Sequence, residues 1–128
     1  MYLVYILKSG KYSYVGMTND FFHRWRQHTQ EVKGGARYTS RHTSEMWYPI
    51  LIIDGFETMK EAMQCEWKLK RKRGHSQRVQ WAHELLTCHD TWTSKSPLIK
   101  DQSLTVYVDD TYKHLFPHYE TSQLYWKP

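Results

Sequence analysis

Cysteine is scarce in this 128-residue sequence, and long hydrophobic runs are absent. Its two cysteines, Cys65 and Cys88, are too few for a disulfide framework or a cysteine-rich zinc module, so we expect a reducing compartment. No apolar run approaches the ~20 residues that span a bilayer, and Met1-Tyr2-Leu3 lacks the basic segment that opens a signal peptide. We therefore expect an intracellular protein with no membrane contact.

The signatures of several enzyme classes are also missing. There is no glycine-rich phosphate-binding loop, no Gly-x-Ser-x-Gly motif and no cysteine nucleophile beside an organised base. The eight histidines show no paired spacing that completes a tetrahedral zinc site. These absences argue against P-loop nucleotide hydrolases, serine hydrolases and a structural zinc.

Charge of one sign, in contrast, is abundant in part of the chain. The net charge is +5, yet residues 1–78 hold fourteen Lys and Arg against seven Asp and Glu, a charge of +7. Residues 79–128 hold four Lys against six acidic residues, a charge of −2. The densest basic run is Lys68–Arg73. Such a surplus favours nucleic acid as a partner, because neutralised phosphates release counterions. A solvated helix face or a nuclear-import patch is the alternative interpretation.

The N-terminal residues predict a β-hairpin. Tyr2–Leu7 and Tyr12–Gly16 are rich in aromatic and β-branched residues, and Ser9-Gly10 between them is a turn signal. With Ser9-Gly10 at the tip, Tyr5 pairs directly with Tyr14. Directly paired residues project to the same side of a sheet, so this register predicts two neighbouring phenols.

A third strand and three helices complete the expected fold. Ile50–Ile53 is apolar without alternation, as in a central strand covered on both faces. Thr18 or Asn19 is the expected cap of the first helix. We predict an α/β (α+β) fold with a small three-stranded antiparallel sheet flanked by helices. The predicted helices span Asp20–Gln30, Thr58–Arg73 and Arg78–Leu86.

Glu66 is the most informative position in the long helix. At about 100° per residue it lies in the middle of an apolar stripe. An unpaired carboxylate in apolar surroundings costs on the order of several kcal/mol, so Glu66 requires a cation. That cation is either an arginine, with Arg24 as the candidate for a buried pair, or a metal ion. The stripe consists of Met59, Ala62, Met63 and Leu69.

The same helical projection separates the basic residues of Lys68–Arg73 into two groups. Lys70 and Arg73 point within roughly 40° of Glu66 and are expected to line its groove. The other basic residues of the run, Lys68, Arg71 and Lys72, point away.

Taken in order, these residues resemble the GIY-YIG nuclease superfamily. In that superfamily a first motif ends in a tyrosine, here Tyr5, and a second reads Tyr-Ile/Val-Gly, here Tyr14-Val15-Gly16. An arginine and a histidine follow on the first helix and a metal-binding glutamate on a later one. The Gly-Ile of the first motif is replaced by Leu3-Val4. Within the superfamily, about residues 1–74 are most similar to the catalytic subunit of Slx-type structure-specific endonucleases. The likeness is carried by Tyr14–Asn19, Arg24–His28, Gly34–Thr39, Glu45-Met46, Ile52–Phe56 and Ala62–Trp67.

The resemblance implies a GIY-YIG fold and a metal-dependent endonuclease. Its substrates would be flaps, forks and four-way (Holliday) junctions in DNA repair and recombination, which places the protein in the nucleus or another DNA-containing compartment. Glu66 would hold one divalent metal, Mg²⁺, with Mn²⁺ as a substitute. The alternatives are a sequence-specific nuclease of the same family and a non-catalytic nucleic-acid-binding module that retains the fold.

The resemblance also assigns roles to the remaining site residues. Arg24 would contact the scissile phosphate. We expect Tyr5 to be the general base and Tyr14 to position water or phosphate, with His28 accepting the proton or acting as the base itself. A phenol has a pKa of about 10, so an arginine and a phosphate must lower it. The residues expected to hold flanking DNA backbone are Arg26, Arg37, Arg41, Lys70 and Arg73.

The last third of the chain is expected to be an extension. We assign residues 1–88 to the nuclease domain and 89–128 to a C-terminal extension packed on the core rather than a separate domain. Slx-type relatives carry a cysteine-rich zinc domain that docks a scaffold protein. Because this sequence has two cysteines and stops at Pro128, we expect neither that domain nor scaffold binding. The aromatic tail is expected to pack intramolecularly, with a homo-oligomer surface as the alternative.

Overall fold

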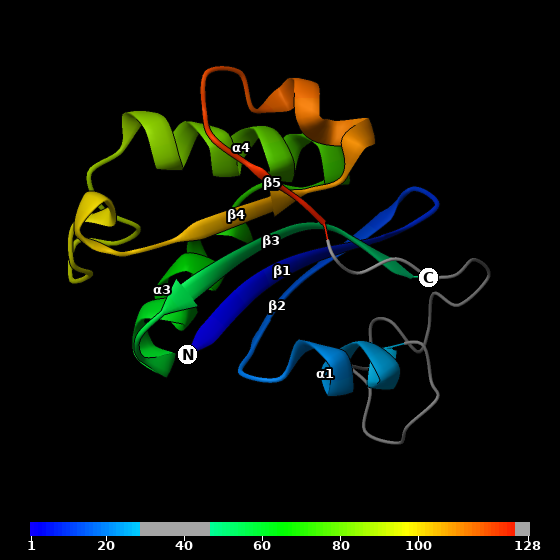
Figure 1. Ribbon diagram of the computed structural model, residues 1–128, viewed down its shortest axis with the longest axis horizontal. Helices are drawn as coiled ribbons and strands as arrows, with labels where there is room; N and C mark the ends of the chain where they lie inside the picture. Colours follow the sequence, from blue (N-terminus) through cyan, green and yellow to red (C-terminus); the bar gives the residue numbers. More distant parts are fainter. Residues whose placement is uncertain (29–46, 125–128) are drawn as a thin grey trace.

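A twisted sheet forms the centre of the computed structural model, which describes residues 1–28 and 47–124 (Figure 1). In the described residues it has five strands in the order β2-β1-β3-β4-β5, antiparallel except for the β4–β5 pair. The mixed α/β class is confirmed, but three strands were too few because the C-terminal extension contributes two more. The strands are β1 Tyr2–Ser9, β2 Tyr12–Thr18, β3 Tyr48–Phe56, β4 Thr105–Val108 and β5 Ser122–Gln123.

Helices cover both faces of the sheet. The described helices are α1 Phe21–His28, α3 Met59–Leu69 and α4 His75–Cys88, with the 3₁₀ turns η1 Ile99–Asp101 and η2 Asp110–Leu115. In Figure 1, α1 lies below the sheet and α4 and η2 lie above it. Helix α3 ends at Leu69, earlier than predicted, because the chain turns at Gly74 (φ +85°) before α4 begins. No helix within residues 1–28 and 47–124 is long and apolar enough to cross a membrane.

Side-chain alternation along β1 builds the two halves of the core. Val4 and Ile6 pack with α3 and α4, whereas Leu3, Tyr5 and Leu7 pack on the side of α1. In β3, Ile50–Ile53 is fully buried, which confirms the predicted central strand. The apolar run in β3 therefore separates two packed layers, and Tyr5 belongs to the layer that contains α1.

The hairpin register differs from the prediction by two residues. Tyr5 lies opposite Gly16, and Leu7 lies opposite Tyr14. The turn is at Gly10-Lys11, where Gly10 has φ +57°. A two-residue turn of type II′ requires positive φ at its first central position, and only glycine adopts it freely. Because the shift is even, Tyr5 and Tyr14 stay on the same face as diagonal neighbours.

The C-terminal extension packs against the core through its aromatic residues. Tyr112 and Phe116 are buried beside α4, and Tyr119 packs partly against the same cluster. Strand β4 pairs with β3, and the Asp109 amide donates to the Ile50 carbonyl at 2.9 Å. These contacts support intramolecular packing of the tail, of which Tyr125 and Trp126 lie outside the described residues. Removing the residues after 108 would therefore uncover the core.

Candidate active site

Two tyrosines from neighbouring strands form the centre of the site. Tyr5 on β1 is 1% exposed, Tyr14 on β2 is partly exposed, and their ring centroids lie 6.3 Å apart. Gly16 provides the space for Tyr5. A Cβ at Gly16 would clash with the Tyr5 hydroxyl and would lie 2.6 Å from Tyr5 Cζ and 2.9 Å from Tyr14 Cε1. The glycine of the second motif therefore lets the Tyr5 ring lie across β2.

Gly16→Ala is expected to displace the Tyr5 ring and destabilise the fold. Overpacking of a filled site costs about 1–3 kcal/mol of unfolding free energy. Denaturant unfolding measures the cost. In a Tyr5→Leu background, which removes Cζ and the hydroxyl, the same Gly16 substitution should cost less. An equal cost in both backgrounds would show that Tyr5 is not the group that requires glycine.

Helix α1 supports the tyrosines from below. Phe21 stacks on Tyr5 with centroids 5.1 Å apart and planes at 12°. Trp25 packs edge-on against Phe21, and its Nε1 donates to the Trp47 carbonyl at 3.2 Å. The sequence analysis did not identify Phe21 as a residue of the site. Phe21 fixes the plane of the Tyr5 ring.

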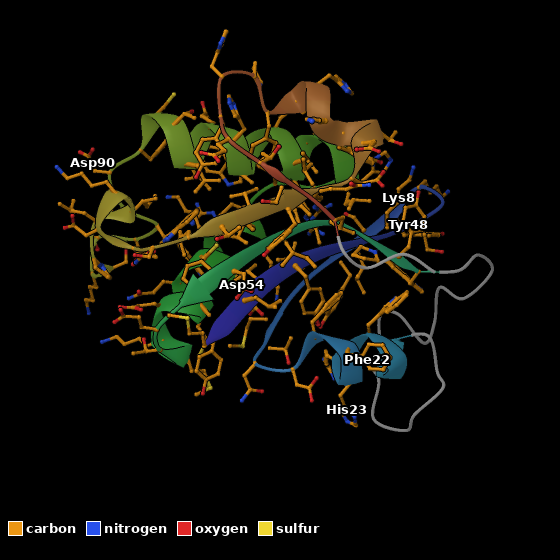
Figure 2. The ribbon with its side chains drawn as sticks, viewed as in Figure 1. Lys8, Phe22, His23, Tyr48, Asp54 and Asp90 are labelled. Atoms are coloured by element: carbon orange, nitrogen blue, oxygen red, sulfur yellow. The ribbon has the colours of Figure 1, made fainter. Side chains whose placement is uncertain are left out.

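The cap of α1 is Asp20, not Thr18 or Asn19 as predicted. Asp20 Oδ1 accepts from the His23 amide at 3.2 Å, while Thr18 Oγ1 accepts from the Asp20 amide at 3.0 Å. His23 and the exposed Phe22 are on the outside of α1, and His23 points away from the sheet (Figure 2). The helix is thus fixed at its first turn, which sets the position of Arg24 one turn further on.

Arg24 joins the two tyrosines. Its guanidinium forms hydrogen bonds with the hydroxyls of Tyr5 and Tyr14. Burial, and then Tyr14, raise the pKa of Tyr5 well above its ordinary value. Arg24 acts in the opposite direction but is outweighed, and Glu66 adds a smaller upward contribution. The net shift is opposite to the expected lowering, so the Tyr5 hydroxyl keeps its proton at neutral pH.

Tyr5→Phe is expected to make the protein less sensitive to alkali. The native state holds a proton on Tyr5 that the unfolded chain releases near pH 10. The free energy of unfolding therefore falls as pH rises above about 10, and phenylalanine removes this contribution. Urea unfolding at about pH 8 and about pH 10.5 compares the two proteins. An equal loss of stability in both would contradict the raised pKa.

Glu66 lies beside the buried face of α3 rather than in the middle of an apolar stripe. The buried residues of α3 are Ala62, Cys65 and Leu69, whereas Met59 and Met63 are about half exposed. The Glu66 side chain is 22% exposed, and its Oε1 lies 3.3 Å from Lys70 Nζ. Among the described residues its ion pair is with Lys70, which does not support the alternative of a buried Glu66–Arg24 pair. The Glu66 carboxylate makes only a small upward contribution to the pKa of Tyr5.

The donor set at Glu66 fits a hydrated hard cation. Residues 1–28 and 47–124 contain no group of three or more His, Cys, Asp and Glu side chains that could together hold a metal. A cation at Glu66 would therefore have at most two such ligands from the described residues and would complete its shell with water or phosphate. Mg²⁺ is commonly bound in this way, through one or two carboxylates plus substrate phosphates.

A basic groove of about 500 Å³ lies beside Tyr14. Lys70 and Arg73 both line it, but Glu66, whose groove they were expected to share, is not among its lining residues. Arg78, which the sequence analysis missed, also lines it, because the turn at Gly74 folds α4 back toward β2. Arg78 Nη1 donates to Ser13 Oγ at 3.0 Å and its Nε donates to the Lys72 carbonyl at 2.8 Å.

The other basic residues of the run are engaged elsewhere. Arg71 lies over the Trp67 ring and Lys72 over the Trp81 ring, each 4.9 Å from the centroid. Of the remaining predicted residues, Arg26 and His28 lie on α1, and their side chains are not among those described. Arg37 and Arg41 lie outside the described residues.

Comparison with known proteins supports the same set of elements. Residues 1–79, more than half of the chain, match the GIY-YIG catalytic domain. The chain belongs to the GIY-YIG family. The matched region contains the hairpin, α1 and α3, and therefore every element that contributes to the tyrosine–arginine–glutamate arrangement.

Several curated proteins are similar to this member of the GIY-YIG family. The structure-specific endonuclease subunit slx1 of Aspergillus niger is 35% identical over 86 residues, covering 65% of this chain and 20% of the relative. The slx1 subunit of Schizosaccharomyces japonicus is 33% identical over 109 residues, covering 82% and 35%. The SLX1 homolog of Giardia intestinalis is 40% identical over 60 residues, covering 47% and 16%. The matches thus span between about a sixth and a third of these relatives.

Proposed function

We propose that this chain is a metal-dependent, structure-specific DNA endonuclease that hydrolyses phosphodiester bonds in branched DNA. The observation that carries the proposal is the Arg24 guanidinium, held by Tyr5 and Tyr14 on one face of the hairpin. The slx1 relatives are named structure-specific endonuclease subunits, and this supports the proposal of a branched substrate. A DNA substrate would place the protein in the nucleus or another DNA-containing compartment.

Arg24 would stabilise the charge that develops on the scissile phosphate. Its planar fork of donors matches phosphoryl oxygens, and the tyrosine hydroxyls hold it in position before substrate arrives. Donors that are already oriented stabilise a transition state without reorganisation. Phosphate oxygens would thus accept hydrogen bonds from Arg24, while the two tyrosine hydroxyls keep the guanidinium in position.

Tyr5 and Tyr14 would have different roles in the reaction, because they differ in burial. Tyr5 keeps its proton, so we assign it the role of a neutral hydroxyl that orients Arg24. Tyr14 is more exposed and would meet the attacking water. The proton from that water would pass to the His28 imidazole, either directly or through the Tyr14 hydroxyl, which would give up its own proton as it takes one. This assignment replaces the expectation that Tyr5 is the general base.

Glu66 would hold the divalent cation, Mg²⁺ or Mn²⁺. When bound, the cation would supply positive charge to the phosphate and the departing 3′ oxygen. Lys70 neutralises the Glu66 carboxylate in the structure described here and would be released toward the DNA backbone when a cation takes its place.

The basic groove beside Tyr14 would hold the DNA backbone away from the cut. Lys70, Arg73 and Arg78 line it, and we propose Arg26, Arg37 and Arg41 as further backbone contacts. Contacts with phosphates position a duplex without reading its sequence. A groove that contacts only the DNA backbone would select a substrate by the shape of the DNA rather than by its sequence.

Lys70→Gln is expected to weaken DNA binding more than Lys68→Gln. Lys70 lines the groove, whereas Lys68 points away from it, and both changes remove one charge. In metal-free buffer, the Lys70 variant should lose affinity for every DNA alike, and the salt dependence of log Kd should fall by about 1. Fluorescence anisotropy across a salt series measures both. Equal effects at the two positions would contradict the groove assignment.

The substrate class is tested with labelled linear, 5′-flap and four-way-junction DNA of shared sequence, incubated with purified protein and Mg²⁺. We expect cuts near the branch point and little cutting of linear DNA. Cuts at one sequence in all three substrates would favour the sequence-specific alternative. Binding to DNA with no cutting would favour the non-catalytic module.

The word subunit in the relatives' names supports a further proposal, that this chain acts together with a partner protein. Titrating a purified candidate partner against the chain while measuring flap cleavage would test it.

A further inference from the structure

An exposed apolar stripe runs along α3 beside Glu66. Met59, Met63 and Trp67 follow each other at i, i+4 and i+8, and they are 52%, 50% and 53% exposed. Residues three or four apart are neighbours on a helix, so Met63 lies next to both Glu66 and Trp67. Apolar surface at this position borders the carboxylate to which we assign the metal.

Trp67 is held in one orientation. The Arg71 guanidinium lies over its ring, 4.9 Å from the centroid, and such a cation–π contact stabilises by about 0.5–1 kcal/mol at an exposed site. About half of the side chain stays exposed. The indole therefore presents a flat apolar surface whose position is fixed.

The charge around Trp67 indicates the kind of molecule that covers it. Lys68, Lys70, Arg71 and Lys72 follow it in sequence, and Lys70 lines the basic groove. A ligand at this position combines a flat apolar part with negative charge, which is the chemistry of a nucleotide. A purely apolar protein surface would leave these charges without counterparts.

We propose that Trp67 stacks on an unpaired base of the DNA substrate at its branch point. The inference rests on the proposed function. In an intact duplex both faces of each base are covered by neighbouring bases, whereas flaps, forks and junctions leave base faces open. Base–aromatic stacking tolerates any sequence, because every base has a π-face. Trp67 thereby contributes to the choice of branched over linear DNA.

The test measures binding of the intact chain in metal-free buffer to a labelled single strand, a 5′-flap and a blunt duplex. Trp67→Ala should weaken binding to the single strand and the flap about 10-fold and binding to the duplex less than about two-fold. Trp67→Phe should retain most of the affinity. Phe22→Ala is the matched control, because Phe22 is also 53% exposed but lies on α1, away from α3.

Four outcomes would overturn the inference. Equal loss on all three DNAs would mean that Trp67 does not distinguish open bases. If Trp67→Ala lost affinity for none of the three DNAs while wild-type protein still cut flaps, the inference would be wrong and the proposed function would stand. Loss of partner-dependent stimulation without loss of DNA binding would make the stripe a protein contact. If wild-type protein neither binds nor cuts branched DNA, the proposed function fails together with the inference.

Discussion

Arg24→Ala is expected to lower the cleavage rate about 10³-fold while the protein remains folded. Removing one oriented donor to a developing oxyanion costs about 10²–10³ in rate, and arginines that stabilise phosphoryl transfer contribute about 10³–10⁵. Arg24 forms hydrogen bonds with both tyrosine hydroxyls, so its loss also removes the group that joins β1 and β2 at the site. Single-turnover kinetics on a flap substrate would measure the change.

Two further variants separate the geometry of Arg24 from its charge. Arg24→Lys keeps the charge but loses the planar fork, so it should recover only a small part of the rate. Lys95→Ala removes an exposed charge far from the site and should cut at the wild-type rate. Near wild-type cutting by Arg24→Ala would place the phosphate contact elsewhere.

Glu66→Gln is expected to abolish cutting with Mg²⁺ while preserving DNA binding. The substitution removes the ligand charge with little change in volume, so the cation would lose the carboxylate proposed to hold it. It also releases Lys70, whose Nζ lies 3.3 Å from the carboxylate. Binding of flap DNA in metal-free buffer should therefore stay equal or become slightly tighter.

Glu61→Gln is the matched control on the same helix. Glu61 closes the capping box of α3 with Thr58, and glutamine is also suited to that position. This variant should bind and cut like wild type. If Glu66→Gln cut at the wild-type rate with Mg²⁺, Glu66 could not be the metal ligand.

The sequence could predict those parts of the site that depend on the order of the motifs and on the face of the sheet from which a side chain projects. The hairpin placed Tyr5 and Tyr14 on one face even though its register was wrong by two residues, because an even shift preserves the face. The tip was misplaced because Ser9-Gly10 was chosen for the central positions, whereas Gly10 occupies the first of them. The diagonal placement of Tyr5 and Tyr14, and the need for glycine at position 16, can be recognised only once the observed strand register is known.

Periodicity could not show which side of α3 faces the core. Met59 and Met63 fit an apolar stripe as well as Cys65 does, but the helix packs on Ala62, Cys65 and Leu69. We therefore expected Glu66 to be more buried than it is. The arginine considered as its partner, Arg24, is not its ion-pair partner among the described residues, which is Lys70. Arg78 was missed because its place beside Ser13 depends on contacts far apart in the sequence.

The extension was harder to interpret because its strands are short. Strand β4, Thr105–Val108, has four residues and β5 has two, which is too little for a pattern of alternation. Figure 2 shows Lys8 and Tyr48 at one end of the sheet, where Lys8 Nζ lies 5.7 Å from the ring centre of Tyr112 in η2. Contacts of this kind, formed between distant segments, decide where the tail packs.

Cleavage of a labelled 5′-flap by wild-type protein and by the Glu66→Gln and Arg24→Ala variants, with Mg²⁺ and with EDTA, tests the central claim most directly. We predict cutting near the branch point by wild type with Mg²⁺, none with EDTA, and at least a 10²-fold lower rate in both variants. Equal cutting by all three proteins, or cutting unaffected by EDTA, would contradict a metal-dependent site built from Tyr5, Tyr14, Arg24 and Glu66.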